Sequence, residues 1–391
     1  MPLRILHLFA DWKWTGPAEP TVNLCLALRA RGHDVTFACS RGPRHVLQTI
    51  AGKARERGLE PRLDFDLRRR FRPLAILRDL RAIEHFVRTR AIQVVHVHLS
   101  HDHVVGGIAA RRAPTRPLLV RTNHKGVPLE PHRANDFLFR RLTDGYVGLS
   151  REAARTDAEF AGFAPGQVWT VEGAVDLDRF RDRGNAGEAR ARFGFLPEHV
   201  VLGIVARMQR HRRFDVLLEA VRKATDVFPA LRVLIVGRGT HRRAVAREPV
   251  RRLGLEDRVV FAGYRSGDYV DALGAIDVKV FLVPGSDGSC RAVREAMAMG
   301  KPVIAARRGM LPEIVADGET GRVVDDTPEN LAEAIVGLCR DPALRRRMGL
   351  AARAAAERRF SLAAQAETIE RAYLTLLDRR PPLRTWGWLG I

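Results

Sequence analysis

The sequence predicts an α/β protein made of two doubly wound domains, each with a mostly parallel sheet covered by helices. Three observations support this prediction. The 391 residues exceed what one hydrophobic core usually organises. Short apolar runs alternate with longer helical patterns, which is typical of parallel sheets. The same alternation starts again after a polar stretch, Arg181–Glu188, which we interpret as the linker between the two domains.

The first series of apolar runs predicts the sheet of the N-terminal domain. Its expected strands are Leu3–Phe9, Val35–Cys39, Val94–Val97, Leu118–Thr122, Tyr146–Leu149 and Val168–Val171. Between the first two runs, Thr21–Arg31 carries apolar residues at helical spacing and is followed by Gly32. A glycine just past the last turn is a helix-stop signal, so this segment is expected to be a helix.

The second series predicts a second sheet of the same kind. Its expected strands are Val200–Val205, Arg232–Val236, Arg258–Phe261, Val278–Leu282 and Pro302–Ala306, with helices over Asp215–Phe228 and Thr240–Leu253. In doubly wound sheets, ligands bind beyond the carboxyl ends of the strands. The side chains that directly follow each strand are therefore the first candidates for a functional site.

The composition, 46% hydrophobic and 28% charged, is that of a globular protein. No apolar run approaches the roughly 20 residues of a membrane-spanning helix. The N-terminus runs directly into a predicted strand, without the pattern of a signal peptide. The four cysteines have no metal-ligand or CxxC spacing, so we expect a reducing, cytoplasmic location and no structural zinc.

The formal net charge of +21 and the pI of about 11.1 are the unusual values. They leave several interpretations open: an arginine-rich coding habit, attraction to an anionic membrane surface or a phosphorylated substrate, or nucleic-acid binding. No zinc finger, KH loop or aromatic RNP strand is recognisable, so no nucleic-acid partner is expected.

In the first half, the loop Asp11–Pro17 contains Gly16 and leads into the first predicted helix. Backbone N–H groups at such a helix start can bind a phosphate or a sugar hydroxyl, although one glycine is also typical of an ordinary turn. The pattern is not GxGxxG, which argues against a nicotinamide site.

Histidines follow two strands of the first half. His96, His98, His101 and His103, with Asp102, could suggest a metal site, but His96 and His98 alternate with valines on a strand. A structural role or a place lining a cleft is the favoured interpretation, and no metal is expected. His124 directly follows the next strand, Leu118–Thr122, and is the better functional candidate.

In the second half, Arg207 and Arg212 share one loop after a strand. Two guanidinium groups can clamp a diphosphate, although a solvated basic loop would look the same. Gly237 lies in a second glycine-rich loop after a strand, and Gly263 and Tyr264 end a third strand, where the backbone could contact a nucleotide base.

The segment 284–290 is expected to form a loop that leads into a helix beginning near Arg291. Its start favours a phosphate or a sugar oxygen through the helix dipole. Glu295, about one turn into this helix, could accept hydrogen bonds from both ribose hydroxyls. The alternatives are that Asp287 is an ordinary loop acid and that Glu295 is an exposed helical acid paired with an arginine.

Along the second half, one ordered set of motifs can be read. It comprises Val205–Arg207, Arg212, Asp215–Ala220, Leu234–Gly239, Val259–Gly263, Asp277, Glu295–Val303, Pro312–Val315 and Asp317–Gly321. In this order and spacing, the second half resembles the donor-binding domain of retaining group 1 glycosyltransferases (glycosyltransferase family 4-like). The first half agrees more loosely, through Arg31–Val35, Val95–His98, Thr122–His124 and Ala174–Asp176.

The resemblance implies the GT-B architecture, in which two Rossmann-like domains face a cleft. It implies an acceptor-binding domain over residues 1–183 and a donor-binding domain over 184–361. The C-terminal helix and tail, 362–391, would then cross back to the first domain. It further implies transfer of a sugar from a nucleotide-diphosphate-sugar donor with retention of anomeric configuration, without a metal or any other cofactor.

The resemblance also assigns roles. Arg207 and Arg212 would hold the donor diphosphate, and Glu295 would bind the ribose hydroxyls. Asp287 and His124 would contact the donor sugar. The remaining donor contacts would come from Gly16, Gly237, Gly263, Tyr264, Gly288, Ser289, Cys290 and Arg291.

The chain departs from the family pattern at several of these positions. Asp287 replaces the usual glutamate, and Ser289-Cys290 replaces the usual Phe-Gly. Arg212 stands where the family usually has lysine, and Arg213 where it often has glycine. Gly173-Ala174 replaces the usual Asn-Gly. These departures indicate a divergent, active member that differs in its donor sugar or in the sugar's pose. A degenerate, inactive member is the alternative.

The basic amphipathic stretch Leu74–Arg90, with the high net charge, favours a lipid-linked or saccharide acceptor in lipopolysaccharide, glycolipid or other cell-envelope glycan synthesis. The protein would then be peripheral on the inner face of the cytoplasmic membrane. An ordinary surface helix is the alternative, and the tail Thr385–Leu389 would pack on the first domain or touch lipid. Rival functions are a sugar-nucleotide 2-epimerase of the same fold, a phosphorylase, which is disfavoured because no lysine signature for pyridoxal phosphate is present, and a non-catalytic basic binding protein.

Overall fold

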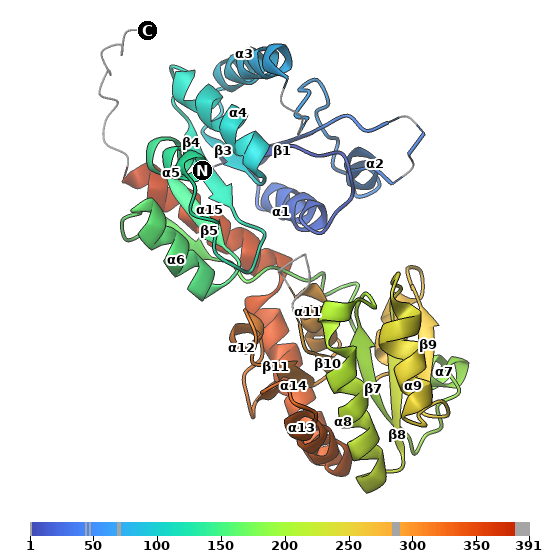
Figure 1. The fold of residues 1–391 in the computed structure, drawn as a ribbon. Helices are drawn as coiled ribbons and strands as arrows, with labels where there is room; N and C mark the ends of the chain where they lie inside the picture. Colours follow the sequence, from blue (N-terminus) through green and yellow to red (C-terminus); the bar gives the residue numbers. More distant parts are fainter. Residues whose placement is uncertain (1, 44, 47, 69–71, 284–289, 380–391) are drawn as a thin grey trace. The chain divides into compact units, whose positions relative to one another are not determined.

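The computed structural model describes residues 2–43, 45–46, 48–68, 72–283 and 290–379. They form two compact units, each built on a parallel six-stranded sheet (Figure 1). Unit 1 comprises the chain up to Val171 and the described part from Gln365, and unit 2 comprises Glu172–Ala364. The fold class predicted from the alternating pattern is confirmed.

The sheet of unit 1 has the strand order β2-β1-β3-β4-β5-β6. Its strands are β1 (Arg4–Phe9), β2 (Asp34–Cys39), β3 (Val94–Val97), β4 (Leu118–Thr122), β5 (Gly145–Gly148) and β6 (Val168–Thr170). Its helical segments are α1 (Ala18–Ala30), α2 (Ile50–Arg55), α3 (Pro73–Thr89), α4 (Ser100–Arg112), α5 (Arg133–Phe137), the π-helical turn η1 (Leu138–Leu142), α6 (Arg151–Ala161) and α15 (Leu362–Asp378).

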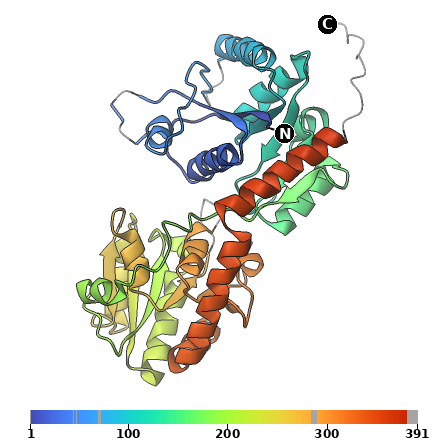
Figure 2. The same ribbon diagram turned by 180° about the vertical axis from the view of Figure 1, so that it is seen from behind.

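Each face of this sheet buries a separate apolar core. On one face, Leu6 and Leu8 of β1 pack with residues of α3 and α4 such as Ile83 and Val105. On the other face, strand residues such as Ile5 pack with α1, α2 and α15. Figures 1 and 2 show these helices on the two sides of the sheet. Alternate residues of a strand point to opposite faces of the sheet. Because both sets are apolar here and each packs against helices, the sheet lies in the middle of its unit.

Unit 2 repeats the plan with the strand order β12-β11-β10-β7-β8-β9. Its strands are β7 (Val200–Val205), β8 (Leu231–Val236), β9 (Val259–Gly263), β10 (Val278–Phe281), β11 (Val303–Ala306) and β12 (Gly321–Val324). Its helical segments are α7 (Ala186–Arg192), η2 (Arg210–Arg212), α8 (Phe214–Val227), η3 (Arg243–Arg247), α9 (Glu248–Arg252), α10 (Tyr269–Gly274), α11 (Arg291–Ala298), α12 (Leu311–Ile314), α13 (Pro328–Arg340) and α14 (Pro342–Arg359).

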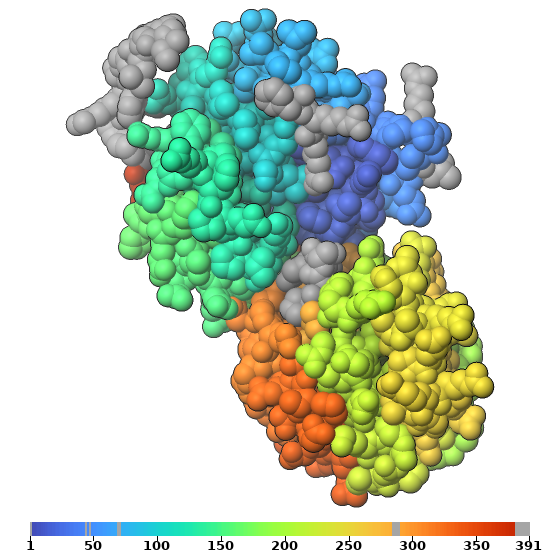
Figure 3. Space-filling view, viewed as in Figure 1, coloured from blue at the N-terminus to red at the C-terminus, as the bar shows by residue number. Residues whose placement is uncertain are grey.

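One face of the second sheet is covered by α8 and α13, which meet at the surface as neighbouring lime-green and orange-red regions (Figure 3). Leu217 of α8 and Ile335 of α13 belong to one core with Ile204 and Ile235 of the sheet. Two details differ from the sequence prediction. Strand β12 was not predicted, and the expected helix Thr240–Leu253 is a π-helical turn followed by the short helix α9.

The two units divide at Val171/Glu172, whereas the sequence places the end of the first domain at residue 183. The intervening segment is bound to unit 2. The Val175 N–H donates to the Phe360 carbonyl at 2.7 Å, and the Arg359 guanidinium pairs with Glu172 at 2.6 Å. Part of the expected linker is held there as well, because the Asn185 amide donates to Asp271 at 2.9 Å.

Helix α15 belongs to unit 1 from Gln365 onward. Ala366, Ile369, Tyr373 and Leu376 are buried in the core that also contains α1. Glu370 pairs with Arg31 and lies 3.1 Å from the His33 ring, next to the end of α1. None of the helices in the described ranges is both long and apolar enough to cross a membrane. The expected tail contact of Thr385–Leu389 lies outside the described residues.

Candidate functional site

The candidate residues of unit 2 gather at the carboxyl ends of four neighbouring strands, β10, β7, β8 and β9. Arg207 follows β7, Gly237 follows β8, and Gly263 is the last residue of β9. Glu295 lies on α11, the helix that follows β10. The structure therefore brings residues separated by about ninety positions in sequence to one edge of one sheet.

Arg207 and Arg212 differ in environment. Arg207 is exposed, and Arg212 is only 9% exposed. The Arg212 Nη1 donates a hydrogen bond to the Val283 carbonyl, just beyond β10, at 3.0 Å. Of the two arginines expected to bind a diphosphate, Arg212 is thus held in place by the protein and Arg207 is open to solvent.

The glycines of this edge permit close packing of the loops. A Cβ on Gly237, whose φ is +144°, would lie 2.1 Å from the Ala206 carbonyl oxygen, and one on Gly239 would lie 2.2 Å from that of Met208. The Gly237 N–H also donates to the Gly263 carbonyl at 2.8 Å. Only glycine fits such an approach, so the loops after β7, β8 and β9 form one connected edge.

Tyr264, the residue after β9, presents an open aromatic face. It is 65% exposed, and the Arg238 guanidinium lies 4.8 Å from its ring centroid. An exposed aromatic ring beside a cation can stack on a planar group such as a nucleobase. This placement is compatible with the donor-binding role predicted for Tyr264.

Glu295 is buried and fixed by two neighbours. One prediction for it was an exposed helical acid paired with an arginine; the arginine is present, but the acid is not exposed. Its side chain is 7% exposed, and the Tyr269 hydroxyl donates to Oε2 at 2.6 Å. Arg291, one turn earlier, places its Nε 3.3 Å from Oε1. Burial, then the charge of Glu295, raises the pKa of Tyr269 well above its ordinary value, so the phenol stays protonated and donates.

Sequence reasoning missed two residues that interact with this carboxylate, the half-buried Tyr269 through a hydrogen bond and the buried Lys279 through its charge. Tyr269 begins α10 and had no motif to mark it. Lys279 lies inside β10 and is fully buried, and burial lowers its pKa to about 7 against the opposing effect of Glu295. A lone lysine within the apolar run Val278–Leu282 was a detectable signal, because lysine is almost never fully buried without a partner.

The helix after β10 begins at Arg291, as predicted. Cys290, just before it, is fully buried and has a left-handed backbone with φ +48° and ψ 38°. Arg213 is also left-handed, with φ +57°. These are two of the three positions at which the resemblance leads us to expect glycine, and for these two the structure gives a physical reason for that family preference. The third, Ala174, is not among the residues with positive φ. The predicted sites Asp287, Gly288 and Ser289 lie outside the described residues.

In unit 1, both predicted residues lie near the start of α1. Gly16 is exposed, two residues before α1, whose N-cap Pro17 supplies no side-chain hydrogen bond. The His124 Nε2 lies 3.5 Å from the hydroxyl of Thr21, in the first turns of α1. The helix start and the histidine thus lie together within this unit.

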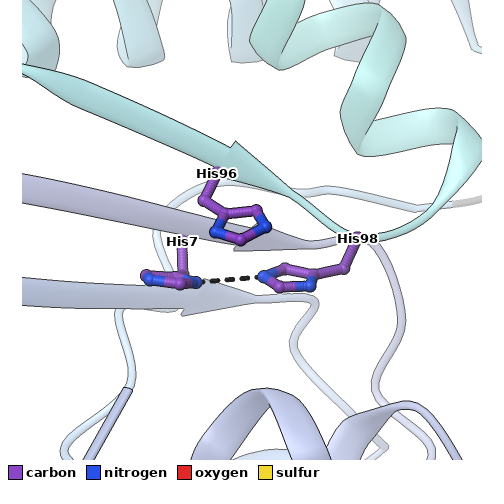
Figure 4. A group of neighbouring side chains, drawn as sticks. All are labelled: His7, His96 and His98. Carbon is purple, nitrogen blue, oxygen red and sulfur yellow. Dashed lines mark hydrogen bonds between the residues drawn. The ribbon is translucent and has the colours of Figure 1, made fainter. Parts of the chain in front are cut away.

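A group of buried histidines is linked to His124 through His98. His7 on β1, His96 on β3 and His98 just after β3 could offer nitrogen atoms within 4.8 Å of one another (Figure 4). His7 Nδ1 lies 3.0 Å from His98 Nε2, and His98 Nδ1 lies 3.0 Å from His124 Nε2. Sequence reasoning named His96 and His98 but missed His7, which shares a register position with His96.

The electrostatics keep these rings neutral. Burial lowers the pKa of His7 and of His124 to about 3, and burial followed by neighbouring charges lowers those of His96 and His98 well below the usual range. Both nitrogens of His96 already have neighbours, Tyr373 Oη at 2.5 Å and Thr122 Oγ1 at 2.6 Å. A metal ion held by His7, His96 and His98 would have to displace one of these contacts.

Comparison with known proteins adds independent information. The family model described as "Glycosyl transferases group 1" matches residues 186–355, and that described as "Glycosyltransferase Family 4" matches residues 16–179. A D-inositol 3-phosphate glycosyltransferase from Streptomyces avermitilis is 36% identical over 202 residues, covering 48% of this chain and 42% of the relative. The chain spans about half the length of the curated relatives it matches.

Solved structures share the fold at low identity. A glycosyltransferase from Rickettsia africae ESF-5 superposes with a TM-score of 0.81 at 17% identity, covering 97% of this chain and 100% of the other. HepE from Anabaena, in complex with UDP and glucose, has a TM-score of 0.75 at 20% identity, with coverage of 97% and 100%. Each similarity extends over both units of this chain.

Proposed function

The chain belongs to the group 1 glycosyltransferases, with two Rossmann-like domains, and from this premise we propose that it transfers a sugar from a nucleotide-diphosphate-sugar to an acceptor. The observation that carries the proposal is the buried carboxylate of Glu295, fixed by Tyr269 and Arg291 at the strand ends of unit 2. A carboxylate oriented in this way can accept hydrogen bonds from a ribose, and solved HepE contains UDP.

In the proposed reaction, Arg207 and Arg212 bind the diphosphate and stabilise the charge that develops as the sugar leaves. Arg212 contributes more per contact, because its guanidinium is already held by the Val283 carbonyl and loses little freedom on binding. Tyr264 stacks on the base. We propose retention of anomeric configuration and independence from metals as part of this function, on the family resemblance.

A thermal-shift panel of UDP-, GDP- and ADP-sugars tests the donor assignment. One donor should stabilise the wild type by about 2.7 kcal/mol at a hundredfold excess over its dissociation constant. Glu295→Ala should lose most of that shift. The matched control is Glu357→Ala, another acid of unit 2 paired with an arginine one turn earlier, Arg353 at 2.7 Å. Equal shifts in all three proteins would refute the assignment of Glu295.

The same panel separates the rival functions. If no sugar nucleotide stabilises the wild type, the chain is better described as a non-catalytic basic binding protein than as an enzyme. If the stabilising donor is converted into its 2-epimer without an acceptor, the protein is an epimerase. Product analysis by NMR distinguishes this outcome from transfer and also reports the anomeric configuration.

We propose that the acceptor carries an anionic group. A pocket of 580 Å³ in unit 1, at the ends of β1 and β2, is lined by Lys13, Arg41, Arg68 and Arg72. Its one acid, Asp11, uses Oδ1 to accept the N–H groups of Trp12 and Lys13 at 2.7 and 3.1 Å. The excess of cations favours a phosphorylated acceptor, and the similar Streptomyces avermitilis protein is named for D-inositol 3-phosphate.

An anionic acceptor could be a soluble sugar phosphate or a lipid-borne one, as in lipopolysaccharide or glycolipid synthesis. Helix α3 favours a membrane surface, because Leu74 is 84% and Leu77 48% exposed on a helix that also exposes Arg78 and Arg81. Sedimentation with anionic vesicles at low salt, in wild type and in Leu74→Ser/Leu77→Ser, tests this. Turnover of inositol phosphate, but not inositol, without vesicle binding would support the soluble acceptor instead.

A further inference from the structure

The three rings His7, His98 and His124 form a continuous hydrogen-bonded line across three adjacent strands of unit 1. His7 lies on β1, His98 follows β3 and His124 follows β4, and these strands are neighbours in the sheet. The nitrogen–nitrogen distances are 3.0 Å for both links. Figure 4 shows the first link, with the His96 ring beside it and not between the two partners.

Elementary proton counting restricts this line. A neutral imidazole has one N–H and one bare nitrogen, and each of the two links needs one N–H and one bare nitrogen. His98 uses both of its nitrogens, so it must donate on one side and accept on the other. If His98 carries its proton on Nδ1, then His124 must accept on Nε2 and carry its own proton on Nδ1, and His7 must donate from Nδ1. The reverse choice places all three protons on Nε2.

We propose that these three histidines share one tautomer and change it only together, so that His7 decides whether His124 Nδ1 is a donor or an acceptor. His124 Nδ1 is the nitrogen that takes part in neither link, on a ring that is only partly buried. His7 and His98 thus act as positioning residues for His124. That Nδ1 meets a sugar hydroxyl rests on the proposed function, but the shared tautomer does not.

The far end of the line makes this coupling consequential. His7 Nε2 is buried and has no hydrogen-bond partner among the described residues. Whichever proton arrangement forms, this nitrogen is unsatisfied, as a bare nitrogen or as an N–H group, and leaving a buried polar atom unsatisfied is unfavourable. The balance between two imperfect arrangements at His7 therefore determines, through His98, the protonation of His124 Nδ1, the nitrogen outside both links.

A metal ion is the competing interpretation of the same cluster. Two observations disfavour it. Both His96 nitrogens already lie within hydrogen-bonding distance of Tyr373 and Thr122. The Arg121 guanidinium is also buried nearby, and its charge acts on His96 and His98. A cation next to a ligand set of neutral imidazoles weakens metal binding.

Long-range ¹H–¹⁵N correlation spectra of the whole protein, labelled at histidine nitrogens, test the proposal at pH 7.5. The expected result is that His7, His98 and His124 carry their protons on the same nitrogen, Nδ1 or Nε2. His103 provides an internal control. It should carry its proton on Nε2 whatever the others do, because Thr143 Oγ1, 2.8 Å away, donates its hydrogen to the Leu138 carbonyl at 2.9 Å.

A variant tests the coupling directly. His7→Phe should change the tautomer populations of His124, two rings away, and donor sugar added to the wild type should shift the ¹⁵N signals of His7. The matched variant His103→Phe should leave His124 unchanged. Different tautomers within the line, a His124 that ignores His7→Phe, or stoichiometric Zn²⁺ uptake by His7 and His98 would each overturn the proposal. If no sugar nucleotide binds, the proposed function fails while the wild-type spectrum still decides this inference.

Discussion

The two sheets differ in the polar groups that are buried at the carboxyl ends of their strands. In unit 1, the polar groups linked to His124 are neutral rings joined by hydrogen bonds, and one charged pair, Arg121 with Asp102 at 4.0 Å, is buried nearby. In unit 2, the buried Glu295 carboxylate is bound by Tyr269 and Arg291, and the Lys279 ammonium is buried inside β10. Burying a neutral network costs little free energy, but its hydrogen bonds depend on which nitrogens carry the protons. Buried ions are stable only while their charged or hydrogen-bonding partners are present.

The largest expected effect comes from Asp102, which is 0% exposed and is the most deeply buried acid among the described residues of unit 1. Asp102 accepts the N–H groups of Ala10 at 3.0 Å and Leu99 at 2.7 Å, and Arg121 lies 4.0 Å away. Asp102→Ala leaves those donors and a buried guanidinium without this partner, so unit 1 should lose about 3–5 kcal/mol of stability. Denaturant unfolding of the full chain checks this prediction.

Asp102→Asn serves as the control, because the amide oxygen can still accept one of the two N–H groups. It should cost clearly less than the alanine variant. Equal and small effects of both variants would contradict the view that unit 1 depends on this carboxyl.

The second effect is selective acid sensitivity of unit 1. His7 and His124 have folded pKa values of about 3, below the ordinary 6.5, so the unfolded chain binds more protons as the pH falls. Their stabilisation is fully present above pH 6.5 and is lost as the pH falls towards 3, by about 2 kcal/mol for each ring between pH 6.5 and 5. Asp102, whose pKa burial raises to about 7, acts in the opposite direction, but as one group against several rings.

Hydrogen exchange measured by mass spectrometry at pH 7 and pH 5 resolves the two units separately. Protection should fall in β1, β3 and β4 and change little in β7 and β8. His7→Phe should reduce the difference between the two pH values. Uniform loss of protection in both units would show that the neutral rings do not distinguish them.

A third effect sharpens the description of unit 2. Lys279 Nζ has no hydrogen-bond partner among the described residues, so Lys279→Met should stabilise unit 2 by about 1–3 kcal/mol at pH 7. The lysine's folded pKa of about 7 lies below its unfolded value, so its own penalty disappears as the pH rises towards 10. The advantage of the methionine should therefore shrink at high pH, as thermal unfolding at pH 7 and pH 9.5 would show.

The smallest expected effect concerns the two left-handed residues. Glycine is usually about 1 kcal/mol less stable than alanine within a helix. At Cys290 and Arg213 the order should reverse by about 1 kcal/mol, because alanine retains the left-handed penalty and glycine does not. Gly/Ala pairs at both positions, compared by thermal unfolding, measure this directly. If the alanine variant is more stable than the glycine variant at either position, backbone strain does not explain the family's preference for glycine there.

The fold could be predicted because apolar runs and helix signals repeat locally. All eleven predicted strands are present, and Arg291 begins its helix as expected. Strand β12 was not predicted because its sequence, Gly321–Val324, has only two apolar residues in a row, Val323 and Val324. The boundary between the two units at residue 172 could not be predicted from the sequence, because it is set by long-range contacts such as that between Glu172 and Arg359.

The candidate site was predictable only where motifs mark it. Arg212, Gly237 and Glu295 stand in recognisable patterns, and the structure gives each a defined environment. His7 and Tyr269 are single residues in ordinary surroundings, and their partners lie 91 and 26 positions away along the chain. No local pattern in one sequence reports such a distant pairing.

The passage of the chain from unit 2 into α15 has a consequence for synthesis on the ribosome. Unit 2 is one continuous segment and is complete once Ala364 has emerged, whereas unit 1 still lacks Ile369, Tyr373 and Leu376 of its core at that moment. The half that is made first therefore finishes folding last. Until α15 arrives, the apolar surface beside α1 remains exposed, and nascent chains stalled before Gln365 should depend on chaperones.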